Sequence, residues 1–171
     1  SLSLSLSSNE NRPLITVIIL SSGRFAGTVF EGRSSLVHKT FRRYTVRAKA
    51  GGGQSSHDNK GRHAKSAGAT LRRYGEAALQ DEVRDLLHHW YDYIESSSLI
   101  LLAVPKTMRT LIFEDPHPSG PAISRTDPRI REVPFMVQRP TYEETQRILE
   151  RSSTILFVPR GERERERNEE G

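Results

Sequence analysis

Two short runs of apolar residues do most to constrain how this chain can fold. The runs are LITVIIL at Leu14–Leu20 and LILLAV at Leu99–Val104, and neither contains a charged side chain. A strand that is apolar at nearly every position, instead of at every second one, is buried on both faces of its sheet. Each run is far too short to cross a lipid bilayer as a helix. The runs therefore predict strands in a sheet whose two faces are both covered.

The stretch before the second run predicts a long amphipathic helix. Apolar residues recur at helical spacing from Leu71 to Ile94, and Ser66 is a suitable residue to cap the start of the helix. Tyr74 and Trp90 belong to this apolar stripe. We expect both aromatic side chains to lie in the core.

The other segments complete an α/β fold. Apolar strands joined by helices favour parallel pairing, whereas strands joined by tight turns favour antiparallel pairing. The pattern therefore predicts a mixed β-sheet flanked by helices. The further elements expected are strands at Phe25–Glu31, Leu36–Val46, Val133–Gln138 and Ile155–Val158, a short helix from Pro105 to about Phe113, and a helix from Thr141, which has capping-box spacing to Glu144.

The length of 171 residues fits one domain with tails. We expect a disordered leader at residues 1–12, the domain at 13–160, and a charged tail or linker at 161–171. The leader lacks the basic and apolar regions of a signal peptide. The chain has no cysteine, which rules out disulfides and thiolate metal sites and suits a reducing compartment such as the cytoplasm.

Positive charge is concentrated in one part of the chain. Ten of the 26 Lys and Arg residues lie between His38 and Tyr74, where the one acidic residue is Asp58. Within this region, residues 48–65 have neither helical nor strand periodicity, and long loops of this kind are usually functional or disordered. A basic region on an otherwise mildly acidic domain predicts a polyanionic partner, nucleic acid above all. A lysine-rich face that is merely solvated is the alternative.

Several common catalytic arrangements are missing from the sequence. It contains no phosphate-binding loop of the nucleotide hydrolases, no dinucleotide-binding glycine motif and no nucleophile elbow. His57, Asp58 and His63 lie close together but without a recognised metal-ligand spacing. We expect no metal site and no cofactor, with a metal-dependent nuclease as an alternative hypothesis.

The basic loop carries Gly51-Gly52-Gly53-Gln54 at its centre. Glycine lets another backbone or a sugar approach closely. The Gln54 amide both donates and accepts hydrogen bonds, so it can orient a water or a hydroxyl without acting as a strong base. Such a neutral tip between cations suits a crowded site made largely of RNA.

Residues 43–58 resemble a known family. Gly52-Gly53-Gln54 is similar to the GGQ tip of class I release factors, whose middle, peptide-release domain carries the tip on a mixed α/β sheet. The wider stretch RRYTVRAKAGGGQSSHDN resembles more closely the release-factor-like domain of the Vms-type ankyrin-repeat and zinc-finger peptidyl-tRNA hydrolases of ribosome-associated quality control. The positions that match this pattern are Arg43, Tyr44, Arg47, Lys49, Gly51, Gly52, Gln54, Ser55 and Asp58, and the family's variable position before the glutamine is Gly53 here.

The resemblance implies an enzyme that frees stalled nascent chains from peptidyl-tRNA on the large ribosomal subunit. It implies cleavage of the tRNA near its CCA end without a metal, with catalysis by Gly52, Gly53 and Gln54. The implied contacts to tRNA and rRNA come from Arg43, Tyr44, Arg47, Lys49, Ser55, Asp58 and Lys60. It also implies an AAA segregase ATPase as partner, through a region that these residues do not contain.

Three questions stay open at this stage. Ester hydrolysis, as in classical release factors, and a non-catalytic ribosome-binding or RNA-binding module are alternatives to cleavage of the tRNA backbone. Tyr44 is suited either to stack on a base or to pack the root of the loop. Asp58 is better suited to fix a nearby arginine than to act as a general base, since cations keep it ionised.

Overall fold

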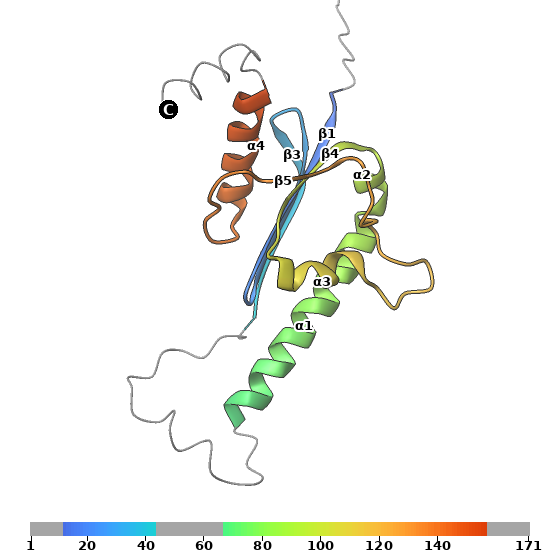
Figure 1. Ribbon diagram of the computed structural model, residues 1–171, viewed down its shortest axis with the longest axis vertical. Helices are drawn as coiled ribbons and strands as arrows, with labels where there is room; N and C mark the ends of the chain where they lie inside the picture. Colours follow the sequence, from blue (N-terminus) through green and yellow to red (C-terminus); the bar gives the residue numbers. More distant parts are fainter. Residues whose placement is uncertain (1–11, 44–66, 157–171) are drawn as a thin grey trace, which may run out of the picture.

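The computed structural model describes residues 12–43 and 67–156 of the chain. The described strands form one mixed sheet in the order β3-β2-β1-β4-β5 (Figure 1). The two hairpin pairs, β1 with β2 and β2 with β3, are antiparallel, while β4 pairs in parallel with β1 and with β5. The strands are β1 (Leu14–Ser21), β2 (Arg24–Glu31), β3 (Ser34–Arg42), β4 (Ser97–Ala103) and β5 (Ile130–Glu132).

Two glycines make the hairpin turns possible. Gly23 and Gly32 have φ angles of 72° and 60°, in the left-handed region that side chains disfavour. Each turn places two residues between its strands, which fixes the register of β1, β2 and β3.

Helices cover both faces of the sheet, as the apolar runs predict. One face packs against α1 (Ala67–His89), α2 (Tyr91–Glu95) and α3 (Arg109–Phe113). α3 directly follows the 3-10 turn η1 (Lys106–Met108). The other face packs against α4 (Tyr142–Leu156) (Figure 1). β1 shows the division clearly. Ile18 and Leu20 belong to the core on the α1 side, while Val17 and Ile19 belong to the core on the α4 side. All four are essentially inaccessible to solvent.

Paired hydroxyls satisfy four of the buried polar side chains inside this core. The Thr16 and Ser97 hydroxyl oxygens lie 2.8 Å apart, as do those of Thr28 and Thr145. The second pair joins β2 to α4 and so helps to fix that helix on the sheet. The expected start of α4 is confirmed, because the Glu144 N–H donates to the Thr141 hydroxyl over 3.1 Å.

The expected strand at Val133–Gln138 is wrong. The strand at this place is β5, which ends at Glu132. The Val133 N–H still donates to the Leu102 carbonyl over 3.0 Å, but Pro134 follows and has no N–H to continue the ladder. Phe135 and Val137 instead pack against the core on the α4 side.

The expected strand at Ile155–Val158 is also wrong at its first two positions. α4 continues through Leu156, and Phe157 and Val158 lie outside the described residues. Ile148, Leu149 and Ser152 are all buried, at the spacing of one helix face, and the backbone of α4 continues beyond them. The leader, the tail and the Ser66 cap lie outside the described residues too, apart from Arg12.

Candidate functional site

One edge of the sheet collects most of the strand ends. β1, β3, β4 and β5 run in the same direction, so their carboxyl ends meet at the lower edge in Figure 1. We call this the carboxyl edge. The first turn of α1 lies beyond the same edge (Figure 1). Arg43 and Ala67, which flank the sequence bearing the GGGQ motif, are therefore both at this end of the molecule.

Of the residues predicted to form the site, the structure describes Arg43. The other predicted site residues lie outside the described ranges, as do His57 and His63, so their roles remain predictions. These residues are Tyr44, Arg47, Lys49, Gly52, Gly53, Gln54, Ser55, Asp58 and Lys60.

Arg43 is held at both its backbone and its side chain. Its N–H donates to the Gly23 carbonyl over 2.7 Å, which extends the β2–β3 end of the sheet by one hydrogen bond. Its guanidinium binds the Glu82 carboxylate through two nitrogens, with Nε 2.9 Å from Oε2. This bidentate pair ties the end of β3 to α1. Sequence reasoning missed Glu82, because 39 residues separate the partners and no local pattern joins them.

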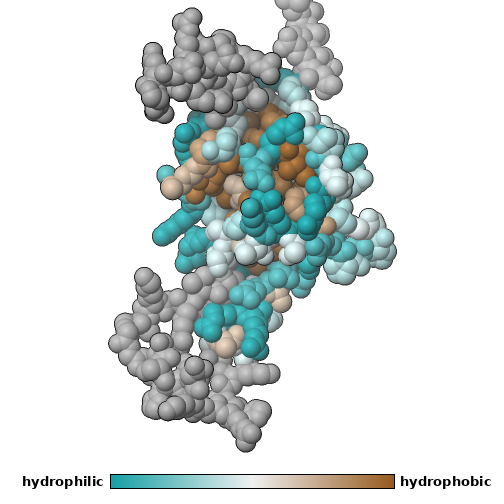
Figure 2. Space-filling model, in the orientation of Figure 1, coloured by the Kyte–Doolittle hydropathy of each residue, from teal (hydrophilic) through white to brown (hydrophobic). Residues whose placement is uncertain are grey.

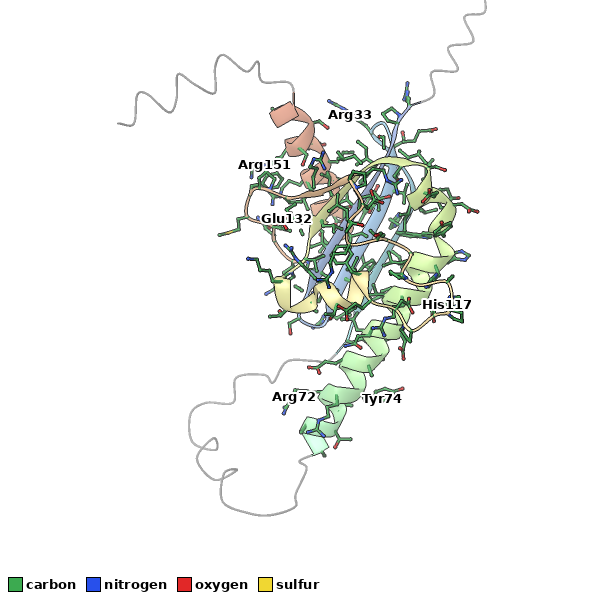
Figure 3. All side chains as sticks on the ribbon, turned by 45° about the vertical axis from the view of Figure 1, so that its right-hand side comes forward. Arg33, Arg72, Tyr74, His117, Glu132 and Arg151 are labelled. Atoms are coloured by element: carbon green, nitrogen blue, oxygen red, sulfur yellow. The ribbon has the colours of Figure 1, made fainter. Side chains whose placement is uncertain are left out.

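The first turns of α1 project past the sheet. Leu71 and Tyr74 are 54% and 73% exposed, so the expectation of a core position for Tyr74 is wrong. Figure 3 shows Arg72 and Tyr74 at this projecting end, which is mostly hydrophilic in Figure 2. The helix is simply longer than the sheet it covers, and its first buried residue is Gly75. Trp90, by contrast, is 4% exposed, as expected.

A pocket of about 380 Å³ opens at the carboxyl edge between α1 and η1. Its apolar lining includes Leu79, Met108 and Leu111. Gly23, which holds the Arg43 N–H, is on its wall. The carboxyl edge therefore combines the Arg43–Glu82 ion pair with a partly apolar pocket.

The described residues contain no group of three or more His, Asp or Glu side chains that could hold a metal ion. His88 and Asp115 do form a pair, with Nε2 2.9 Å from Oδ2. Burial would raise the pKa of Asp115, but hydrogen bonds from the His117 N–H and from His88 outweigh it and lower that pKa below its usual value. This pair ties α1 to the loop after α3.

Comparison with known proteins decides the family. Residues 15–158 match the family model described as the Bacteroidetes VLRF1 release factor. The chain belongs to this release-factor family. Relatives of this family member include the human tRNA endonuclease ANKZF1, 43% identical over 150 residues, and the tRNA endonuclease VMS1 of Saccharomyces cerevisiae, 36% identical over 127 residues. The matches cover 86% and 74% of this chain.

The resemblance to the Vms-type proteins and to a release-factor-like fold is thereby confirmed. The chain spans about a fifth of the length of both relatives, since 20% of each is covered. A solved structure described as the Vms1 mitochondrial localization core matches with a TM-score of 0.54 and 18% identity, over 80% of this chain and 53% of that one. This second likeness supports the fold alone. None of the described helices is long and apolar enough to span a membrane.

Proposed function

We propose that this release-factor-family domain cleaves peptidyl-tRNA, and that it cuts the tRNA backbone near the CCA end. The observation that supports this most is that relatives matching most of the chain are named tRNA endonucleases. The basic carboxyl edge, from which the GGGQ sequence departs after Arg43, is consistent with an RNA substrate.

In the proposed reaction a ribose 2′-hydroxyl attacks the adjacent phosphorus. The 2′-hydroxyl gives up its proton to solvent as a new bond forms between its oxygen and phosphorus. The bond to the 5′ oxygen of the next nucleotide breaks, and this leaving oxygen takes up one proton, so the protons balance. The products are a 2′,3′-cyclic phosphate and a 5′-hydroxyl. Gln54 orients the attacking hydroxyl through its amide. Arg43, Arg47 and Lys49 stabilise the charge that develops on the phosphate. This chemistry requires no metal.

The proposed setting is the large ribosomal subunit in the cytoplasm after a ribosome has stalled. Substrate contacts are assigned to the loop side chains Arg43, Tyr44, Ser55, Asp58 and Lys60, with Gly52 and Gly53 allowing the tip to approach the RNA. A segregase ATPase would bind through a region outside this chain.

The test is a Gln54→Leu substitution, with Gln138→Leu as the matched control. Gln138 is exposed and its side chain has no hydrogen bond among the described residues. With stalled large subunits carrying labelled peptidyl-tRNA, we expect Gln54→Leu to lower release by a factor of about 100 or more, as when a group that positions the reacting atoms is removed. Gln138→Leu should release at the wild-type rate. Wild-type release by Gln54→Leu would refute the proposal.

Mapping the 3′ end of the tRNA product separates the alternatives. A tRNA shortened near its CCA end supports backbone cleavage, whereas a full-length tRNA with free nascent chain indicates ester hydrolysis. Salt-sensitive binding without any product indicates a non-catalytic module. Loss of activity in a chelator would contradict the metal-free mechanism.

A further inference from the structure

The strand register places two arginines side by side at the carboxyl edge. Arg24 of β2 is directly opposite Ser21 of β1 on one side and Arg42 of β3 on the other. Directly opposite residues in antiparallel strands point to the same face, with Cβ atoms about 5 Å apart. The two guanidinium groups therefore start from neighbouring points of one face.

The neighbouring rows show which face this is. Leu20, Phe25 and Phe41 form the next row, and all three belong to the core on the α1 side. Because successive residues of a strand alternate between faces, Arg24 and Arg42 point to the α4 side.

α4 does not extend as far as this row. The first residue of α4, Tyr142, binds the Ser35 hydroxyl over 2.9 Å and stacks on His38 with ring centroids 4.3 Å apart. Arg42 is four residues beyond His38 on β3, which is about 13 Å at the usual rise of a strand. Arg42 is accordingly exposed and Arg24 half-buried. The row also offers the Ser21 hydroxyl, and the exposed Thr40 lies two residues before Arg42 on the same face.

Neither guanidinium has an acidic partner among the described residues. Arg43, Arg109, Arg125, Arg129 and Arg147 each form an ion pair there, whereas no ion pair or side-chain hydrogen bond within the described ranges involves Arg24 or Arg42. Like charges directly opposite each other destabilise a sheet. An anion bound between them would remove this repulsion.

We infer that Arg24 and Arg42 form a binding pair for a phosphate of the RNA backbone. A guanidinium binds phosphate through two parallel N–H bonds, and two guanidiniums beside serine and threonine hydroxyls supply donors from several directions. This inference rests on the proposed function. Arg42 comes directly before Arg43, after which the sequence continues to the GGGQ motif. The arginine pair holds the substrate strand at the root of this segment and takes no part in the bond changes.

The test compares an Arg24→Gln/Arg42→Gln double variant with an Arg33→Gln control in the 171-residue chain. Arg33 is exposed in the β2–β3 turn, at the opposite end of the sheet in Figure 3. Binding of fluorescent tRNA is measured over a range of salt concentrations, and unfolding is measured in urea. The double variant is expected to bind several-fold more weakly, with a log–log salt slope shallower by about 0.7 for each phosphate that it no longer neutralises. Its urea midpoint holds or rises, because the repulsion is gone, and Arg33→Gln changes neither quantity.

Each other outcome overturns part of the assignment. If the double variant binds tRNA with the affinity and salt slope of the wild type, while the wild-type chain cleaves its substrate, the arginine pair is refuted and the proposed function stands. A lower urea midpoint in the double variant would show a structural role for the arginines instead. Failure of the wild-type chain to bind tRNA would refute both. Displacement of bound tRNA by poly-glutamate as readily as by RNA of equal charge would refute RNA as the preferred ligand.

Discussion

At the scale of single residues, Arg129 joins three parts of the fold. Its Nη1 donates to the carbonyls of Ile94, Glu95 and Ser97, at 3.0, 2.7 and 2.9 Å. Its other nitrogens donate to the Asp127 carboxylate, with the shortest distance 2.7 Å. The guanidinium thereby closes the end of α2 and fixes the loop that leads into β5. The pKa of Asp127 lies below its ordinary value of 3.8, chiefly because Arg129 donates hydrogen bonds to it.

This arrangement predicts that stability falls in acid. The pKa of Glu144 is also lowered, mainly by hydrogen bonds from Arg147. Carboxyls with lowered pKa values bind fewer protons in the folded chain than in the unfolded chain. Their contribution to the free energy of unfolding is therefore complete at pH values above the ordinary pKa. It is lost as the pH falls through the lower pKa values of the folded chain. Urea unfolding between neutral pH and about pH 3 should show the free energy of unfolding declining below about pH 4.5.

Asp127→Asn isolates one part of that effect. The variant should be less stable by about 2 kcal/mol at neutral pH, since hydrogen bonds to charged groups contribute about that much. Its stability should change less with pH than that of the wild type, so the difference between them narrows in acid. A constant difference at every pH would contradict the assigned role of Asp127.

At the scale of elements, α1 has two parts with different roles. Its second half packs Leu79, Val83 and Leu87 against the sheet, and Trp90 follows directly in the same core. Its first turns project beyond the carboxyl edge and leave Tyr74 exposed. The packed part stabilises the fold, while the projecting part is available for contacts outside the domain.

This division predicts a large loss of stability for one aromatic substitution and almost none for another. Trp90→Ala should lower the free energy of unfolding by about 3–5 kcal/mol through lost packing. Tyr74→Ala should change it by no more than about 0.5 kcal/mol, as for other exposed sites. Circular dichroism in urea is the suitable probe, because Trp90 is the one tryptophan in the chain. Comparable losses for the two variants would contradict the division.

The same helix shows what the sequence could predict and what it could not. Its apolar period correctly indicated that Val83, Leu87 and Trp90 lie in the core. It did not indicate how far the sheet beneath the helix extends, so Tyr74 was misplaced. β1 and β4 were predictable because apolar residues at nearly every position leave little alternative to a buried strand. The strand expected at Val133–Gln138 failed because Pro134 stops the ladder although its neighbours are apolar.

At the scale of the whole molecule, the site depends on relations between distant segments. The role that we propose for Gln54 rests on its own sequence neighbourhood and stays a prediction. The pairing of Arg43 with Glu82 could not be inferred from the sequence, nor could the row of Arg24 and Arg42, because strand register and helix placement are set by the complete fold. The sequence thus predicts the chemical group, and the fold shows how the carboxyl edge next to Arg43 is held.

The ion pair between Arg43 and Glu82 offers the last prediction. It joins Arg43, which directly precedes residues 44–66, to α1, which directly follows them. Both side chains are partly exposed, Arg43 at 42% and Glu82 at 31%. In a double-mutant cycle of Arg43→Gln and Glu82→Gln, the coupling free energy should be about 0.5–1 kcal/mol at low salt, since exposed pairs contribute little even when bidentate. It should shrink at about 1 M salt, where screening acts over about 3 Å.

If Glu82 mainly positions Arg43 for RNA, Glu82→Gln should slow tRNA cleavage by a larger factor than this small coupling implies. A cleavage rate that falls only in step with stability would show that the pair serves the fold alone.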